Sequence, residues 1–347
     1  MTPGLSLISV GLHDERDMSL RALEEARRCD ALYAEMFTTK LDTDAGRLAA
    51  LIGRPVEEVP RSRLEEGSDA LLDEAGERRV GLLVGGDCLT ATTHIALLIE
   101  ARRRGIPTRV VHGSSILTAV AETGLSLYKF GKTATLPLPE RGPADAVLDA
   151  VEENLGRGLH TLILLDLEAE GDRHLAIDEA TAILIGAGRP HAFDGETLVV
   201  GVARLGSGNP LIRAGRAGEM AKVDFGGPPH ALIVPGRLHF MEAEALSMLG
   251  GCPDDALGGE RAEGELERLV ERYVRSCRGA LEGLTLGTLP RDVGEAEVKD
   301  LIEEAERYLR DAMHYASERG ATALASVCYG EGILDALRLL GLVEFEW

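Results

Sequence analysis

The chain is poor in the features that mark secreted and metal-binding proteins. Its 347 residues include five cysteines, an odd number with no Cys-x-x-Cys pair. Reduced thiols of a cytosolic protein fit this count better than a disulfide framework. The nine histidines are scattered, with no His-x-x-x-His spacing and no Cys/His cluster. We therefore expect no metal site.

Basic residues are also scarce. The chain has 37 Lys and Arg against 58 Asp and Glu, which gives a formal net charge of −21. Nucleic acids and acidic membranes bind basic surfaces, so neither is expected as a partner. No apolar run approaches the roughly 18 residues that span a membrane. The first residues, "MTPGLSLISVGLHDERD", lack a basic segment followed by a long apolar one, so we expect no signal peptide and a cytoplasmic protein.

Three common catalytic or nucleotide-binding fingerprints are missing. The sequence contains no G-x-G-x-x-G, no G-x-x-x-x-G-K-[ST] and no G-x-S-x-G. The segment "FGKTAT" carries Gly-Lys-Thr but lacks the leading glycine at the required distance. These absences disfavour a nicotinamide dehydrogenase.

What is present in the first part of the chain is an alternation of strand and helix patterns. Apolar runs predict strands at 5–12, 31–34, 80–86 and 108–113, and helical spacing appears at 18–29 and 94–105. The runs are apolar throughout rather than alternating. This is typical of a mostly parallel sheet covered on both faces, hence of an α/β fold.

A second group of patterns follows a break near Ser126 to Lys132. Strands are expected at 133–139, 160–169, 196–206 and 228–236, and helices at 176–188 and 239–251. The glycine-rich stretch "GSGNPLIRAG" is expected only to separate two strands. We therefore predict two α/β lobes, residues 1–125 and 126–253.

The composition changes after residue 253. Proline, glycines and acidic residues at 254–263 predict a linker. Three amphipathic patterns follow, at 265–281, 295–320 and 322–341. We predict that residues 264–347 form a small antiparallel helical bundle.

The stretch "LLVGGDCLTATTH" is the first candidate for a binding site. Gly85, Gly86 and Asp87 follow a strand, and ligands of open α/β sheets bind beyond the carboxyl ends of strands. A plain strand-to-helix turn remains the alternative. Ser114 and Ser115 follow another strand, and Asp166 ends a strand of the second group.

Several long segments, in order, resemble the diphthine synthases, which are class III S-adenosylmethionine-dependent methyltransferases related to the tetrapyrrole methylases. The matching segments are "GLHDERDMSLRALEEARRCD", "GDCLTATTH", "LYKFGKTAT", "RGLHTLILLDLEAE", "GETLVVGVARLGSGNPLIRAG" and "DFGGPPHALIVPGRLHFMEAEAL". The resemblance covers about Leu5 to Pro253. It implies a bilobal, tetrapyrrole methylase-like homodimer that holds S-adenosylmethionine in the cleft between the lobes. The cofactor contacts that it implies are Leu12, Asp87, Thr90, Ser115, Ile116, Leu165, Leu205 and His230.

The sequence departs from the family pattern in three loops. Gly85 and Cys88 stand where the family usually has prolines flanking the Gly-Asp pair. Gly113 and Ser114 replace the Ala-Pro of the family's His-Ala-Pro-Ser, and Gly208 replaces a larger residue. These changes are expected to loosen the loops without removing a chemically necessary side chain.

The reaction that the resemblance implies is trimethylation of an amino group. The substrate is the aminocarboxypropyl-histidine of translation elongation factor 2, and the products are diphthine and S-adenosylhomocysteine. An α-amino group has a pKa of about 8, so a dedicated general base is optional and no catalytic residue is assigned. Residues that act either as a base or as turn caps and Arg partners are Asp14, Glu35 and Asp166.

Other side chains are candidates for contacts with the substrate, with a structural role as the alternative. Aromatic rings stabilise quaternary ammonium groups but more often pack in cores. The candidates are Tyr33, Phe37, Tyr128 and Phe130. Lys129 and Lys132 either meet the substrate carboxylate or cap strand ends.

Two rival functions stay open. A tetrapyrrole or corrin-precursor methylase would use the same scaffold, although the "DERD" and "LYKFGKT" segments argue against it. A non-catalytic S-adenosylmethionine sensor would use the helical tail as effector. That tail resembles a small archaeal helical family of uncharacterised function, and either partner recognition or dimer stabilisation would suit it.

Overall fold

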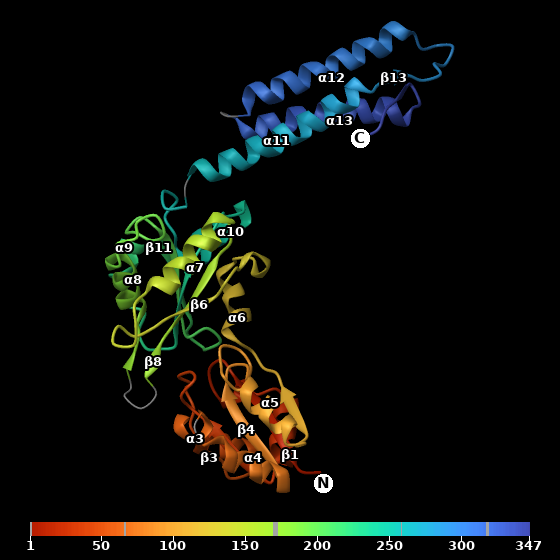
Figure 1. Ribbon diagram of the computed structural model, residues 1–347. Helices are drawn as coiled ribbons and strands as arrows, with labels where there is room; N and C mark the ends of the chain where they lie inside the picture. The colour runs from red at the N-terminus through yellow and green to blue at the C-terminus, as the bar shows by residue number, and fades with distance from the viewer. Residues whose placement is uncertain (1, 66, 169–172, 258, 317–318) are drawn as a thin grey trace. The chain divides into compact units, whose positions relative to one another are not determined.

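The computed structural model describes residues 2–65, 67–168, 173–257, 259–316 and 319–347 (Figure 1). It divides into two compact units, Met1–Leu257 and Gly258–Trp347. Each unit is described by itself. In the described part of the chain, none of the helices combines the length and the hydropathy needed to cross a bilayer.

The first sheet has five strands, all parallel, in the order β3-β2-β4-β1-β5. Their bounds are Gly4–Gly11 (β1), Ala31–Glu35 (β2), Glu57–Glu58 (β3), Arg79–Gly85 (β4) and Thr108–Val111 (β5). The expected parallel sheet is thus confirmed. The carboxyl ends of β4, β1 and β5 lie side by side at one edge.

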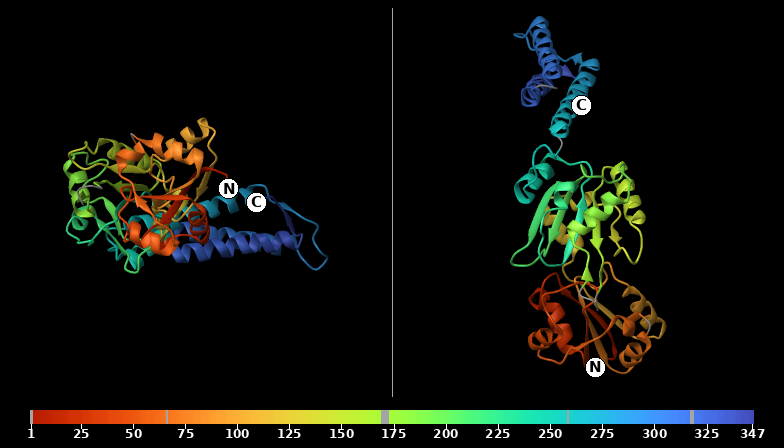
Figure 2. Two further views of the ribbon diagram at one scale, coloured as in Figure 1. Left: turned by 90° about the horizontal axis from the view of Figure 1, so that it is seen from below. Right: turned by 90° about the vertical axis from the view of Figure 1, so that its left-hand side faces the viewer.

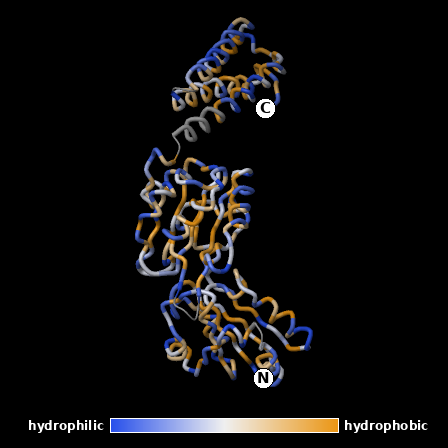
Figure 3. Tube along the Cα trace, turned by 60° about the vertical axis from the view of Figure 1, so that its left-hand side comes forward, coloured by the Kyte–Doolittle hydropathy of each residue, from blue (hydrophilic) through white to orange (hydrophobic). Residues whose placement is uncertain are grey.

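Helices cover both faces of this sheet. Leu48 and Ala26 pack on one face with Ile8, and Leu71 and Leu97 belong to the core on the other face. The helices are α1 (Leu20–Arg28), α2 (Ala45–Ile52), α3 (Arg61–Glu65), α4 (Ser68–Glu77) and α5 (Ile95–Arg103), with a 3-10 turn η1 at Glu15–Asp17. Apolar residues concentrate in the strands (Figure 3), as expected of a sheet buried on both faces.

The second sheet, seen with its strands side by side in the right-hand view of Figure 2, has the order β11-β10-β12-β7-β6. Its strands are Ala134–Leu136 (β6), Thr161–Leu165 (β7), Leu198–Ala203 (β10), Leu211–Arg216 (β11) and His230–Val234 (β12). Only β6 and β7 pair in parallel. The other neighbours are antiparallel.

The glycine-rich stretch is where the sequence interpretation was wrong. It contains β11, which pairs with β10 as an antiparallel hairpin from Leu198 with Arg216 to Ala203 with Leu211. Glycines and Asn209 form the connection, and the apolar residues Leu211 and Ile212 return along β10.

The remaining elements of this unit frame the second sheet. They are α6 (Ile116–Ala119), η2 (Val120–Thr123), η3 (Leu127–Lys129), α7 (Asp145–Gly156), β8 (Leu167–Glu168), β9 (Arg173–His174), α8 (Ile177–Gly186), α9 (Ala217–Met220) and α10 (Phe240–Gly250). Val120 and Leu125 pack into the core of the second sheet. The change from the first core to the second therefore falls between Val111 and Ile116, ahead of the expected boundary at 125/126.

The expected linker at 254–263 also differs from the structure. Ala256 and Leu257 pack against the second core, and Asp255 pairs with Arg216 at 2.8 Å. These contacts attach the first half of the segment to the preceding lobe. Helix α11 (Gly259–Glu282) begins inside the second half.

The second unit consists of three helices, α11, α12 (Glu295–Tyr315) and α13 (Gly320–Leu339). Helix α12 runs opposite to α11 and α13 (Figure 1), as the sequence predicts. Val274, Ala305, Leu309 and Val327 share its core. A pair of short strands, β13 (Thr285–Leu286) and β14 (Val343–Glu344), was not anticipated.

Candidate active site

The first-lobe residues of the predicted site gather at the carboxyl edge of the first sheet. Leu12 follows β1, Asp87 and Thr90 follow β4, and Ser115 and Ile116 follow β5. Because β4 and β5 flank β1 in parallel, the three loops that carry these residues are neighbours.

Gly11 and Gly86 join the carboxyl ends of β1 and β4 at this edge. The Gly86 N–H donates to the Gly11 carbonyl at 2.7 Å, and the Gly11 N–H donates to the Gly86 carbonyl at 3.2 Å. Gly11 has φ of +109°, and a Cβ there would lie 2.3 Å from the Cβ of Asp17. Only glycine fits this position. The Asp17 carboxylate in turn accepts from the backbone N–H groups of Leu12 and His13.

Asp87 uses its carboxylate to tie two of these loops together. One oxygen accepts from the Leu89 N–H at 3.0 Å, and the other accepts from the Gly113 N–H at 3.1 Å and lies 2.8 Å from His112 Nδ1. Burial alone would raise the pKa of Asp87, but these hydrogen bonds outweigh it and the pKa is lowered. Asp87 is thus an ionised anchor of the β4 and β5 ends.

The two hydroxyl groups of the predicted site also have hydrogen bonds within the chain. Thr90 Oγ1 donates to the Asp87 carboxylate at 3.4 Å. Ser115 caps α6, accepting from the Leu117 N–H at 3.0 Å, and Ile116 is the first residue of that helix. Thr90 and Ser115 therefore shape the loops.

The second-lobe residues also share one edge. Leu165 ends β7, Leu205 follows β10 and His230 begins β12. Because β12 is antiparallel to both neighbours, its first residue lies beside their last ones; Ala203 pairs with His230. A Cβ at Gly206 would lie 3.0 Å from the Cβ of Leu12, so the loop after β10 touches the loop after β1. This contact connects the two halves of the predicted site.

His230 carries a buried polar atom without a hydrogen-bond partner at this second edge. Its Nε2 lies 3.1 Å from the Gly227 carbonyl, while its buried Nδ1 has no hydrogen-bond partner in the described structure. Burial and, next, the nearby His174 lower the pKa of His230, so the ring is neutral at pH 7. With Nε2–H donating to Gly227, Nδ1 is a bare acceptor that matches a ligand hydroxyl or amino group.

Two of the three candidate bases are paired with arginines, and the third is buried. Asp14 receives Arg16 Nε at 3.0 Å, and this contact lowers its pKa. Asp166 receives Arg141 Nη1 at 3.0 Å. Glu35 is 2% exposed and accepts from the Phe37 and Thr38 N–H groups, and burial raises its pKa. The catalytic residue therefore stays unassigned.

Among the candidate aromatic residues and lysines, three have contacts within the chain and one is exposed to solvent. Tyr33 is buried and donates to Glu74 at 2.7 Å, and Phe130 stacks edge-on against His160. Lys129 pairs with Glu242, which supports the structural interpretation of that lysine. Tyr128, in contrast, is 99% exposed.

Several residues that shape the site were missed by the sequence interpretation. His112 is the partner of Asp87, and its position at the end of β5 was the only available signal. Arg204 has φ of +52° and donates to the Phe225 and Gly227 carbonyls at 2.6 Å, which fixes the loop beside His230. No group of His, Cys, Asp or Glu among the described residues has a metal-binding arrangement.

Comparisons with known proteins cover the same part of the chain. The family described as tetrapyrrole (corrin/porphyrin) methylases matches residues 4–221. The diphthine synthase of Methanothermobacter thermautotrophicus is 41% identical over 256 residues, which are 72% of this chain and 96% of that protein. The diphthine synthase of Methanosarcina mazei is 38% identical over 263 residues, 73% of this chain and 98% of the relative.

The chain belongs to the diphthine synthase family.

A solved structure agrees with this assignment. A crystal structure of diphthine synthase superposes with a TM-score of 0.69 at 36% identity, covering 73% of this chain and 98% of the other. The tetrapyrrole methylase-like fold is therefore confirmed, and the chain is a methyltransferase. A second family, described as a protein of unknown function (DUF357), matches residues 262–343, which confirms the resemblance of the helical tail to an uncharacterised family.

The departures from the diphthine synthase pattern have a local explanation. A Cβ at Gly85 would lie 2.4 Å from Thr39 Cγ2, so the loop after β2 occupies the space of a side chain there. A Cβ at Gly113 would lie 2.6 Å from the Cβ of Ser9, and the Cys88 N–H donates to Ser9 Oγ. Ser9 therefore lies against two of the positions that depart from the family pattern, Gly113 and Cys88.

Proposed function

We propose that this protein trimethylates the amino group of the aminocarboxypropyl-histidine intermediate on elongation factor 2 to give diphthine. The observation that carries the proposal is the match to diphthine synthases over 96% and 98% of their lengths, which contains both edges of the candidate site. The match uses 72% of this chain, and we propose that the helical tail takes no part in methyl transfer.

The cofactor that we propose is S-adenosylmethionine, which supplies an activated methyl group when bound. Two observations support the fit. The loop ends of the first sheet are held by the Gly11–Gly86 pair and by Asp87, which gives a rigid backbone surface at the first edge. The bare Nδ1 of His230 at the second edge matches an amino or hydroxyl donor, groups that this cofactor carries.

The chain's own residues would act mainly by positioning. Methyl transfer from an activated donor needs the amine, methyl carbon and leaving sulfur in line and water excluded. Leu12 and Leu205 lie on loops that touch at Gly206. Leu205 is buried in the core of the second sheet, so we propose that it meets the cofactor through its backbone. Since Asp14 and Asp166 are held by arginines, we propose that the substrate amine loses its proton to water before transfer.

We further propose that the enzyme works as a homodimer in the cytosol, on a folded protein substrate. Free thiols support that compartment: Cys29, Cys88, Cys252 and Cys277 are buried and unpaired, and Cys328 is exposed.

The substrate class can be tested with methyl-labelled S-adenosylmethionine. The purified chain would be offered the elongation factor carrying the intermediate, unmodified elongation factor, or a uroporphyrinogen-type macrocycle. Label on the modified factor alone supports the proposal. Label on the macrocycle points to a tetrapyrrole methylase, and cofactor binding by calorimetry without transfer to either substrate points to a sensor.

A further inference from the structure

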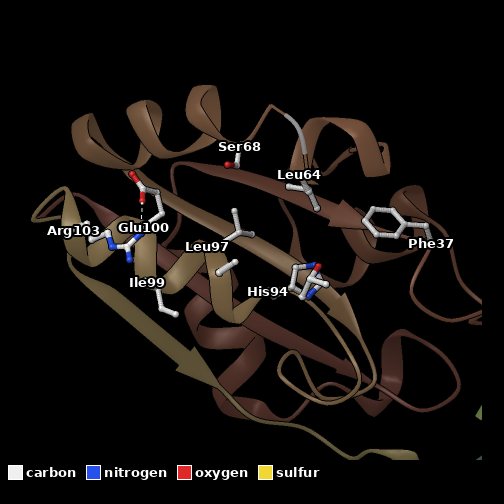
Figure 4. A pocket seen from close by; sticks show the side chains of 10 residues that line it. Phe37, Leu64, Ser68, His94, Leu97, Ile99, Glu100 and Arg103 are labelled. Carbon is white, nitrogen blue, oxygen red and sulfur yellow. Dashed lines mark ion pairs between the residues drawn. The ribbon is translucent and has the colours of Figure 1, made fainter. Parts of the chain in front are cut away.

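Apolar surface outside the candidate active site occurs in both units. In the first unit it lines a cavity of about 620 Å³ between α5 and the α3–α4 segment (Figure 4). The charges on that wall balance each other, since Arg103 Nη1 lies 3.6 Å from Glu100 Oε2. The cavity therefore shows no preference for the charge of an occupant. A face of α13 in the second unit differs, because charges border it without entering it.

Helix α13 is apolar on opposite sides. Its inner side holds Val327 and Leu334, which are buried in the core that α13 shares with α11 and α12. On the outer side, Tyr329 and Leu339 are 66% and 75% exposed. A helix that is apolar all round is normally covered on every side. The exposed side of α13 therefore indicates a contact with a further molecule.

The exposed apolar side of α13 follows the alternating spacing of three and four residues that keeps side chains on one face of a helix. This outer face consists of Thr322, Ala325, Tyr329, Gly332, Ala336 and Leu339. Charged residues make up 27% of the chain, but none lies in these positions. The charged residues of α13 are Glu331, Asp335 and Arg338, which lie off the face.

Large side chains extend the outer face at both borders. Tyr308 of α12 stacks on Tyr329 with ring centroids 5.5 Å apart, and Leu301, on the same side of α12, is exposed. At the opposite border the exposed Trp347 donates from Nε1 to Asp335 at 3.2 Å. Large apolar side chains gathered in this way on a surface mark an interaction site.

Carboxylates also lie along both borders. On α12, Glu304 and Asp311 flank Tyr308 at a distance of one turn on either side. On α13, Glu331 and Asp335 follow each other by one turn at the opposite border. The apolar face is thus framed by acidic side chains.

Only some of these carboxylates are neutralised within the unit. Arg307 pairs with the first of the α12 acids, and Arg338 lies 2.8 Å from the second of the α13 acids. Asp311 and Glu331 have no ion pair in the part of the chain that the structure describes. The uncompensated charge at both borders is therefore negative, and it favours a partner with basic side chains.

This charge pattern selects among the molecules that cover apolar helix faces. An anionic membrane surface attracts basic segments, so acidic borders disfavour it. A second copy of the same face would bring like charges together. An amphipathic helix with basic flanks fits both the apolar spacing and the borders, because a face with heptad spacing accepts the apolar stripe of another helix.

We propose that the outer face of α13 binds an amphipathic α-helix of another protein, whose apolar stripe is flanked by lysines or arginines. The helical unit thereby recruits that protein to the methyltransferase to which it is tethered. The inference goes beyond the methylation reaction, and its test requires neither cofactor nor methyl transfer.

The direct test uses the fluorescence of Trp347, the chain's single tryptophan, at the border of the outer face. The full chain would be titrated with a tryptophan-free peptide of about three heptads, with leucine at a and d and lysine at e and g. The same peptide with glutamate at e and g is the control. We expect a saturable change in emission with the lysine peptide and at least about tenfold weaker binding of the glutamate peptide.

A pair of matched variants shows whether the peptide binds at the outer face. Gly332→Lys places a charge within the face, and the space beyond the Gly332 backbone is open, so the variant should fold. Gly279→Lys, at an exposed position of α11 with the same open space, adds the same charge elsewhere on the unit. We expect Gly332→Lys to weaken binding of the lysine peptide about tenfold or more and Gly279→Lys to leave it unchanged.

Other outcomes would overturn the proposal. No emission change with either peptide, or equal weakening in both variants, would show that the outer face does not bind a basic helix. Binding to phosphatidylglycerol vesicles in place of the peptide would assign the face to a membrane. Assembly of the full chain that Gly332→Lys abolishes, without peptide binding, would assign it to a second copy.

Discussion

The backbone N–H of Cys88 donates a 2.9 Å hydrogen bond to Ser9 Oγ, which joins the loop after β4 to the interior of β1. Ser9 is 1% exposed, and Gly113, after β5, approaches its Cβ so closely that a side chain would collide. Three neighbouring strands are thereby coupled through one small hydroxyl residue directly beneath the proposed cofactor surface.

This coupling predicts that Gly113→Ala is destabilising. The added Cβ would lie 2.6 Å from the Ser9 Cβ, and neither strand end can move freely because Asp87 holds both loops. We expect a loss of about 1–3 kcal/mol in the free energy of unfolding, the usual range for overpacking. Urea denaturation measures it.

Ser9→Gly provides the matched test of the same idea. Ser9→Gly alone should be destabilising because it removes the acceptor of the Cys88 N–H. In that background Gly113→Ala should cost much less than in the wild type, since the collision partner is gone. Additive effects in this double-mutant cycle would show that Ser9 and Gly113 do not interact, contrary to the structure.

His230 should contribute to cofactor affinity through its bare Nδ1. His230→Phe keeps an aromatic ring but removes the acceptor, and we expect S-adenosylhomocysteine to bind about tenfold more weakly by calorimetry, the effect of one lost hydrogen bond. His191→Phe, at an exposed position, is the control. Equal affinity of wild type and His230→Phe would remove this nitrogen from the binding site.

Glu242 should be the main acid-sensitive residue of the second lobe. Burial alone would raise its pKa, but hydrogen bonds from the His239 and Ser126 N–H groups, Lys129 and His160 lower it to about 2. Between the ordinary value of 4.5 and about 2 the unfolded chain binds more protons than the folded one. The stabilisation is therefore complete above about pH 4.5 and is lost as the pH falls toward 2.

Glu242→Gln tests this assignment. His160 Nδ1 accepts from the Gly236 N–H, so its Nε2–H donates to Glu242, and the amide would leave Lys129 without its anion. We expect a loss of about 3 kcal/mol at pH 7 and a flatter stability profile between about pH 4.5 and about pH 2. An unchanged slope there would assign the acid sensitivity to other carboxylates.

The sequence predicted the first lobe better than the second for a physical reason. Strands such as β4, apolar on both faces, and helices closed by glycines such as Gly105 are local signals. The pairing of β11 with β10 gives no such local signal, because Leu211 and Ile212 follow a glycine-rich turn in a segment that resembles a loop. The roles of Asp87 and His112 depend on which strands become neighbours, which spacing alone does not encode.

The helical unit should be dispensable for chemistry. The two relatives described above match 72% and 73% of this chain, and residues 2–257 contain both edges of the site. A chain ending at Leu257 should keep the single-turnover methyl transfer rate of the full chain within about twofold, as expected of separately folded units. A large fall in that rate, with folding confirmed by circular dichroism, would show that the tail acts in catalysis.

The central claim is tested most directly by the mass of one peptide. Elongation factor 2 carrying the aminocarboxypropyl-histidine would be incubated with this protein and S-adenosylmethionine, digested, and its histidine peptide measured by tandem mass spectrometry. The account predicts three methyl increments, all on the modified side chain and absent without enzyme. An unchanged peptide, from a protein shown by calorimetry to bind the cofactor, would contradict it.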